Sequence, residues 1–264
     1  MKRVLLFCTL ALCFTTLAIA ADNPAVNPWI GTWKLDPAKS HFIGDTFTYS
    51  KLPSGMMHFT DGSTVSYDFA IDGKPYKAAY DRTTVWTAAG TNAWNSVTSA
   101  NGKVIYKAHH VLSADGKTLT NTYTGAKPDG SSFNDETVYT RVTGTNGLEG
   151  KWRSTKVNIS APDTFVVSSP SAGILHWDIP SYKESVEGKP DGTDHPITGP
   201  TVPPGLTLSF KYLSPTKISY TVKNNGKPDG YGIQTLSADG KSFTDVSWSP
   251  GKESEKSTGF YAKQ

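Results

Sequence analysis

The chain repeats itself, and this duplication limits the folds that are open to it. The hexapeptide Leu-Ser-Ala-Asp-Gly-Lys occurs at 112–117 and 236–241, and Asn-Gly-Lys occurs at 101–103 and 225–227, so both pairs are 124 positions apart. Three shorter similarities keep the same order: Gly-x-Trp at 31–33 and 150–152, x-Gly-Lys-Pro at 72–75 and 187–190, and Tyr-x-Arg/Lys at 139–141 and 261–263. The whole chain is therefore a tandem duplication, with repeats at about 28–142 and 148–264.

Each repeat alternates apolar and polar residues with a period of two. The alternation is clear over 64–71, 206–212 and 218–223, and Asp-Gly and Asn-Gly pairs lie where hairpins must turn. No stretch of ten residues keeps a helical period, although 36–40 predicts one helical turn. We expect an all-β chain in which each repeat forms eight to ten antiparallel strands. Closure into a barrel would remove the exposed edges, so we predict two tandem barrels.

The repeated hexapeptide has a structural interpretation. Leu112 and Leu236 end apolar strands, and Ala-Asp-Gly-Lys follows each of them. Asp-Gly pairs favour tight turns because glycine adopts positive φ angles without a steric penalty. We therefore expect both copies to be strand ends that pack a leucine inward and then reverse the chain.

The first 20 residues predict a signal peptide. Lys2 and Arg3 precede an apolar run at 4–12, and Ala18-Ile19-Ala20 resembles a small-x-small cleavage site. The apolar run is shorter than the roughly 20 residues of a membrane-spanning helix. We expect an exported protein, periplasmic or extracellular, without a transmembrane segment. The expected domains are the signal peptide at 1–20, a first barrel at 21–143 and a second barrel at 148–264.

The mature chain contains little that suggests thiol chemistry or nucleic-acid binding. Both cysteines, Cys8 and Cys13, lie in the signal peptide, so a disulfide, a cysteine metal site and a thiol nucleophile are not expected. Without Lys2 and Arg3 the chain has 24 basic residues against 23 acidic ones. This balance does not favour nucleic acid as a partner.

Two features make the chain resemble the lipocalin-like, or calycin, barrels. Gly-x-Trp stands at the start of the first strand of each repeat, and a cationic residue stands near the end of each last strand. The segment 31–40 also looks like the opening of exported bacterial proteins of this kind. The resemblance implies that the tryptophan closes one end of the barrel and that the cation packs across it. It therefore pairs Trp33 with Arg141 and Trp152 with Lys263, and it implies that a small lipophilic or amphipathic molecule is the partner.

Catalytic and metal-binding motifs are not evident in the sequence. The nucleophile elbow, the His-Glu-x-x-His metal motif, the phosphate loop and the EF-hand loop are all missing. His109 and His110 are adjacent on an expected strand, so their side chains point to opposite faces and cannot both bind one ion. We expect no metal and no cofactor. An acid–base pair of His109 or His110 with Asp68 or Asp81 remains the alternative on which an enzyme would depend.

The two repeats differ at the positions that alternation directs inward. The second repeat has bulky, mostly apolar residues there, at 206, 208, 210, 212, 218, 220 and 222, whereas the first has Arg82, Thr84, Trp86, Ala88, Trp94, Ser96 and Thr98. We predict that the first barrel holds the ligand, with Arg82, Thr84, Trp86, Trp94 and Ser96 as binding residues. Three alternatives stay open for Arg82: a carboxylate partner, an anionic ligand, or exposure to solvent.

The sequence favours a binding protein over an enzyme. A barrel cup lined by aromatic and hydroxyl groups suits a small apolar or amphipathic ligand. An enzyme on the same scaffold (a hydratase, isomerase or hydrolase) and an envelope module without a small ligand are the alternatives. The sequence assigns no catalytic residue. It leaves the ligand, the oligomeric state and the possibility of one merged sheet system open.

Overall fold

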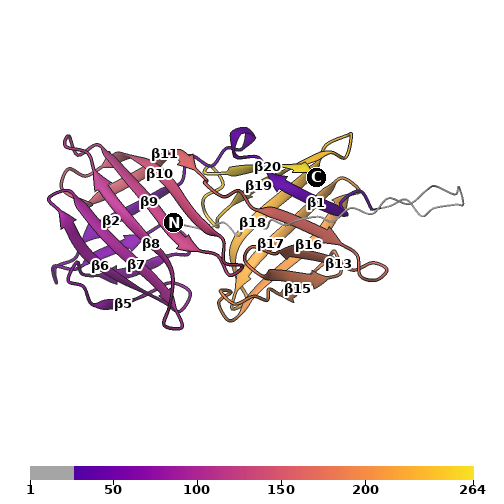
Figure 1. Cartoon of the computed structure of the whole chain (residues 1–264), viewed down its shortest axis with the longest axis horizontal. Helices are drawn as coiled ribbons and strands as arrows, with labels where there is room; N and C mark the ends of the chain where they lie inside the picture. The colour runs from indigo at the N-terminus through magenta and orange to yellow at the C-terminus, as the bar shows by residue number, and fades with distance from the viewer. Residues whose placement is uncertain (1–26) are drawn as a thin grey trace, which may run out of the picture. The chain divides into compact units, whose positions relative to one another are not determined.

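The computed structural model describes residues 27–264, so the expected signal peptide at 1–20 lies outside the described residues. The described chain is all-β and forms two nearly closed antiparallel barrels of ten strands each, as predicted (Figure 1). The expected helical turn is present as a 3-10 turn at Pro37–Lys39, where the side chain of Asp36 accepts a hydrogen bond from the Ala38 amide.

The first barrel is continuous in sequence. Its sheet order is β4-β3-β2-β11-β10-β9-β8-β7-β6-β5. Its strands are β2 (Thr46–Lys51), β3 (Met57–Thr60), β4 (Ser66–Phe69), β5 (Pro75–Ala78), β6 (Arg82–Gly90), β7 (Ala93–Ala100), β8 (Lys103–Leu112), β9 (Thr118–Ala126), β10 (Ser132–Thr143) and β11 (Gly150–Asn158).

The second barrel contains the remaining strands. Its sheet order is β14-β13-β12-β1-β20-β19-β18-β17-β16-β15, so the first strand of the described chain lies beside the last one (Figure 1). Its strands are β1 (Gly31–Leu35), β12 (Thr164–Ser168), β13 (Leu175–Ile179), β14 (Glu184–Gly188), β15 (Asp191–Pro196), β16 (Leu206–Ser214), β17 (Lys217–Asn224), β18 (Lys227–Leu236), β19 (Ser242–Trp248) and β20 (Ser257–Lys263).

The boundaries of the barrels therefore differ from the boundaries of the sequence repeats by one strand. β1 belongs to the first repeat but pairs with β12 and β20, whereas β11 belongs to the second repeat but pairs with β2 and β10. The expectation that each repeat closes on its own first strand is wrong for these two strands. The chain accordingly divides into a unit of His41–Ala161 with Ser247–Ser257 and a unit of Pro162–Val246, Thr258–Gln264 and the described residues up to Ser40.

The short connection from β10 to β11 explains this shift. Only residues 144–149 separate the two strands, which pair as a hairpin from Glu136–Asn158 to Thr143–Lys151. A hairpin of this length costs less loop entropy than a crossover to another sheet. β11 therefore takes the position next to β10, and β1, which carries the same Gly-x-Trp motif, takes the equivalent position next to β20.

The repeated hexapeptide forms the same hairpin turn in both barrels, as predicted. In the first copy, the side chain of Asp115 accepts hydrogen bonds from the hydroxyl of Ser113 at 2.6 Å and from the amide of Lys117 at 3.0 Å. In the second copy, Asp239 accepts the equivalent bonds at 2.6 and 3.0 Å. Leu112 and Leu236 are buried. The repetition of this segment is structural.

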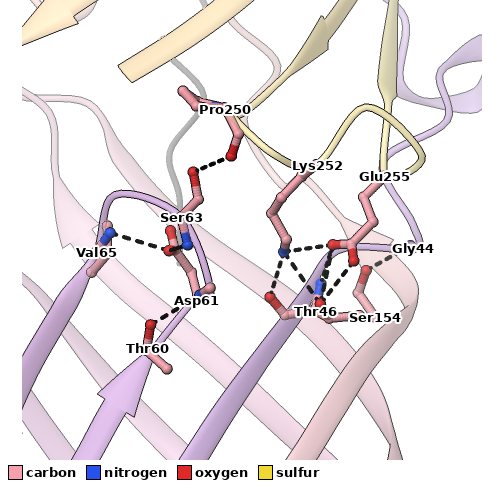
Figure 2. Close-up of polar contacts among 11 residues, drawn as sticks. Gly44, Thr46, Thr60, Asp61, Ser63, Val65, Ser154, Pro250, Lys252 and Glu255 are labelled. Atoms are coloured by element: carbon pink, nitrogen blue, oxygen red, sulfur yellow. Dashed lines mark hydrogen bonds and ion pairs between the residues drawn. The ribbon is translucent and has the colours of Figure 1, made fainter. Parts of the chain in front are cut away.

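The connection from β19 to β20 is held within the first unit by polar contacts (Figure 2). Glu255 accepts hydrogen bonds from the amide and the hydroxyl of Thr46, both at 2.9 Å, and Lys252 donates to the Thr46 carbonyl at 2.8 Å. Lys252 also forms an ion pair with Glu255, and both side chains are largely buried. Ser63 donates to the Pro250 carbonyl at 2.8 Å. These contacts order the connection on the strand end at β2.

Candidate functional site

Each barrel has a cation against the tryptophan of its Gly-x-Trp strand, but the partners differ from those expected. The Arg141 guanidinium lies 4.1 Å from the Trp152 ring centre, and the Lys263 ammonium lies 4.8 Å from that of Trp33. The predicted pairs, Trp33 with Arg141 and Trp152 with Lys263, are thus exchanged. The exchange follows from the shift of β1 and β11, because each tryptophan moves to the other barrel with its strand.

The glycine of the motif makes room for the cation. A Cβ atom at Gly31 would lie 2.6 Å from the Lys263 Cε, whereas one at Gly150 would lie 2.1 Å from the Thr143 carbonyl oxygen and 3.1 Å from an Arg141 guanidinium nitrogen. Both glycines also have positive φ angles, 144° and 134°. Arg141 further donates to the carbonyls of Gly116 and Gly147 at 2.6 and 2.7 Å and to that of Glu149. These hydrogen bonds hold the Arg141 guanidinium in place against the Trp152 ring.

The predicted inward face of β6 and β7 is present in the first barrel. Thr84 and Trp86 on β6 are buried, as are Ser96 and Thr98 on β7, and the strands pair Thr84 with Thr98 and Trp86 with Ser96. Ala88 is exposed, because the buried part of β6 ends at Trp86. The alternation therefore identified the lumen-facing residues correctly in the middle of the strands.

Two of the predicted binding residues lie outside the lining of the cavity described below. Arg82 is the first residue of β6, directly after a turn in which Tyr80 and Asp81 have φ angles of 62° and 53°. It is partly exposed, and its guanidinium lies 5.6 Å from the Tyr80 ring centre. Trp94 is partly buried and packs on the edge of the aromatic core. Arg82 therefore does not line the cavity, and part of its side chain is accessible to solvent.

A cavity of about 30 Å³ lies inside the first barrel. One water molecule needs roughly 10–15 Å³ of cavity volume, so the cavity can hold about two waters or a chemical group of similar size. Its lining combines aromatic rings with hydroxyl, amide and imidazole groups, from Phe47, Tyr49, Phe59, Tyr67, Thr84, Trp86, Ser96, Thr98, Tyr106, His110, Asn121 and Tyr123.

A substitution between the repeats accounts for this space. Ser96 stands where the second repeat has Tyr220, 124 positions later, and the facing residues are Ala108 and Gly232. A Cβ atom at Gly232 would lie 2.0 Å from the Tyr220 ring, so the glycine is what allows that ring to fill the second barrel. The first barrel has a small serine in the same place, and Ser96 there lines the cavity.

Ser96, His110 and Asn121 form a buried hydrogen-bonded chain along the cavity. Ser96 Oγ lies 3.0 Å from His110 Nε2, and His110 Nδ1 lies 2.9 Å from Asn121 Oδ1. The Asn121 amide donates to the Tyr123 hydroxyl at 3.1 Å, and Tyr123 in turn hydrogen-bonds Tyr139. This chain orients the amide so that its oxygen faces His110. With the Asn121 oxygen toward Nδ1, we infer the tautomer that is protonated on Nδ1, in which the Nε2 lone pair accepts the hydroxyl proton of Ser96.

The cavity lining is electrically neutral at pH 7. Burial lowers the pKa of His110 to about 4, although the hydrogen bond to Asn121 opposes this shift. Burial also raises the pKa values of Tyr49, Tyr67 and Tyr123 above their usual range. None of the twelve lining residues is an Asp, Glu, Lys or Arg. A charged ligand would lose its hydration there without gaining a counter-ion, so the cavity favours neutral groups.

The second barrel has a different polar trio at the equivalent positions. Tyr220, Gln234 and Asp245 stand 124 positions after Ser96, His110 and Asn121. The Tyr220 hydroxyl donates to Asp245 at 2.9 Å, and the Gln234 amide donates to it at 3.1 Å. Burial raises the pKa of Asp245 to about 6, against the effect of both hydrogen bonds.

The acid–base pairs that the enzyme alternative required do not form. The His109 side chain bonds to Asn95 on the exposed face, at 2.7 Å. Asp68 instead pairs with His58 across the exposed surface, at 2.6 Å. Among residues 27–264 no group of three His, Cys, Asp or Glu side chains is arranged to hold a metal ion.

Sequence reasoning missed Asn121 and Tyr123, which orient His110. The signal was available in the repeat comparison: alternation puts Asn121 on the same face as Leu119, and its equivalent, Asp245, is also polar. Two aligned polar residues on inward positions indicate a buried hydrogen-bond network.

Within the described residues, no helix has the length and apolar character needed to cross a membrane. Comparison with family models, with curated proteins and with solved structures finds no match for the chain.

Proposed function

We propose that the protein is an exported, lipocalin-like binding protein whose first barrel takes a small ligand with a neutral polar head. The observation that carries this proposal is the cavity beside Ser96 and His110, because it combines aromatic walls with oriented hydrogen-bonding groups. Binding pockets are typically apolar with a few convergent polar groups. The barrel architecture is compatible with such a cup.

The hydrogen bonds define the head group that the cavity suits. With His110 protonated on Nδ1, the Ser96 hydroxyl donates to Nε2, so its oxygen is left to accept a hydrogen bond from the ligand. The indole N–H of Trp86 is buried and has no hydrogen-bond partner among residues 27–264, so it can donate to the ligand. A hydroxyl group both donates and accepts, and it therefore matches this pair. We assign the site to alcohols and phenols in preference to carboxylates.

The size of the cavity limits how much of the ligand enters. About 30 Å³ suits a polar group of two or three heavy atoms in place of water. Tyr67 and Tyr106 are only partly buried, and both line the cavity. Side-chain rotamer changes on binding are common, so rotation of these rings is the route by which a larger apolar body would be admitted.

The test is a titration of the isotopically labelled protein with phenol and, separately, with benzoate, observed through the imidazole nitrogens of His110 by NMR. Phenol should shift the Nε2 resonance saturably, whereas benzoate should not. The double variant Ser96→Tyr with Ala108→Gly transfers the side chains of the second barrel and fills the cavity, so it should abolish the shift. Arg82→Ala is the matched control and should bind phenol as the wild type does.

Three outcomes of this titration would contradict the proposal. Benzoate binding that depends on Arg82 would restore the carboxylate anchor expected from the sequence. Phenol binding that survives in the filled double variant would place the site elsewhere. A complete lack of saturable shifts would favour the module without a small ligand.

A further inference from the structure

The arrangement of Ser96, His110 and Asn121 exceeds what ligand recognition requires. The three groups follow one another in space: Ser96 Oγ lies 3.0 Å from His110 Nε2, and His110 Nδ1 lies 2.9 Å from Asn121 Oδ1. This is the order of nucleophile, general base and orienting group in serine and cysteine acyl-transfer enzymes, and the third group is an amide in some of them. The Asn121 oxygen favours the tautomer that is protonated on Nδ1, and this tautomer presents the Nε2 lone pair to the hydroxyl.

The second barrel shows that the fold itself does not demand these residue types. At the equivalent positions the Tyr220 hydroxyl and the Gln234 amide both donate to Asp245, in a buried trio that contains no aliphatic hydroxyl and no imidazole. A polar trio at this depth can therefore be built without a nucleophile and a base. The first barrel has both, and it also has open space beside the hydroxyl.

We propose that Ser96 is a nucleophile that accepts an acyl group from small neutral esters entering the first barrel. This inference rests on the proposed binding function, since the ester must occupy the same cavity. Ser96 and His110 are the catalytic residues, and Asn121 is a positioning residue that acts through the His110 tautomer.

The reaction balances with water as the second substrate. Ser96 Oγ attacks the carbonyl carbon while its proton passes to His110 Nε2, and the carbonyl oxygen takes up negative charge. The indole N–H of Trp86, which is without a partner in the described chain, is a candidate donor to that oxygen. Collapse breaks the bond to the leaving oxygen, which takes the proton from His110. Water then attacks the acyl-serine by the same proton path and releases the carboxylic acid.

The environment of His110 predicts slow turnover. The low pKa keeps the imidazole neutral at pH 7, so its lone pair is available. Burial also disfavours the imidazolium that each step must form, and Asn121 supplies no negative charge to stabilise it. The cavity volume restricts the acyl group to about the size of acetyl. We therefore expect both the acylation of Ser96 and the hydrolysis of the acyl-serine to be slow, so that an acetyl group, once transferred, persists long enough to be detected by mass.

The experiment incubates the full mature protein with vinyl acetate and follows acetylation by intact mass and peptide mapping. One acetyl group should appear on Ser96. Ser96→Ala should abolish it, and Ser99→Ala, an outward serine on the same strand, should leave it unchanged. His110→Gln should slow it by about 100-fold or more. Asn121→Asp should accelerate it several-fold and raise the His110 pKa, because the second barrel holds a carboxylate at this position.

The outcomes separate this inference from the binding proposal. The nucleophile assignment is overturned if acetylation persists in Ser96→Ala. It is also overturned if neither His110→Gln nor Asn121→Asp changes the rate of acetylation. Phenol binding without acetylation of Ser96 overturns this inference and leaves the proposed function standing. Failure of both phenol binding and acetylation overturns both. Thermal unfolding of each variant shows that a loss of labelling is not a loss of fold.

Discussion

Replacement of Trp33 by alanine should destabilise the second barrel, although Trp33 belongs to the first repeat. The side chain is fully buried, its indole N–H donates to the Trp29 carbonyl at 3.0 Å, and its ring meets the edge of Phe243 at 5.1 Å between centroids. Truncation removes these contacts, leaves a buried carbonyl unpaired and deprives Lys263 of its ring. Tryptophan-to-alanine changes in cores cost about 3–5 kcal/mol.

The assay is amide hydrogen exchange resolved by strand. About 3–5 kcal/mol corresponds to a loss of protection of roughly 140- to 4,000-fold where exchange reports unfolding of the barrel. In Trp33→Ala the amides of β12, β13 and β20 should lose protection, whereas the amides of β2, β3 and β10 should keep it. Trp152→Ala is the matched variant and should give the opposite distribution, because Trp152 donates to the Leu148 carbonyl at 2.8 Å in the first barrel. A loss of protection in β2 and β10 on replacing Trp33 would refute the strand assignment.

Three further predictions test the fold and its buried charge. A fragment of residues 41–161 contains all ten strands of the first barrel and should fold alone with dispersed NMR spectra, although less stably than in the full chain because it lacks the Lys252 and Glu255 contacts to Thr46. Residues 28–142, which follow the repeat, should not fold, because they lack β11. Asp245 has a pKa of about 6 in the folded protein, against 3.8 for a free carboxyl, so the folded state keeps its proton to higher pH than the unfolded state does. The free energy of unfolding should therefore fall as the pH rises from about 4 to about 6, by at most about 3 kcal/mol. Asp245→Asn should remove that slope in urea unfolding curves, and an unchanged slope would contradict the assignment. Gly232→Ala should lower the melting temperature, since the new Cβ would overlap the Tyr220 ring, and an unchanged melting temperature would show that the ring is not held there.

Most of the architecture could be predicted from the sequence because the signals are local. Alternation with period two defines which residues face inward, and Asp-Gly pairs place the hairpins. Leu112 and Leu236 are buried before equivalent turns, as expected. The assignment of β1 and β11 to barrels could not be predicted in this way. Both carry the same Gly-x-Trp motif, so either can close either barrel, and only the short hairpin after β10 decides between them.

The site could be predicted only in part, for related reasons. Thr84, Trp86 and Ser96 line the cavity as the alternation indicated. Arg82 lies on the same face but is the first residue of its strand, where a long side chain reaches solvent. Alternation predicts which face a residue is on, but it does not predict how far from the end of the barrel that residue lies. The role of His110 depends on Asn121, which lies on the neighbouring strand β9, and that pairing follows from sheet register, which composition does not reveal.

The most direct test of the proposed site is the protonation state of His110, measured by long-range proton–nitrogen NMR of the imidazole across pH 4–8. We expect a neutral ring with its proton on Nδ1, no titration near pH 6.5, and an apparent pKa of about 4. Addition of phenol should then perturb Nε2 more than Nδ1, because Ser96 bonds to Nε2. A ring that titrates near pH 6.5, or that carries its proton on Nε2, would contradict the buried and oriented cluster on which both the binding site and the nucleophile depend.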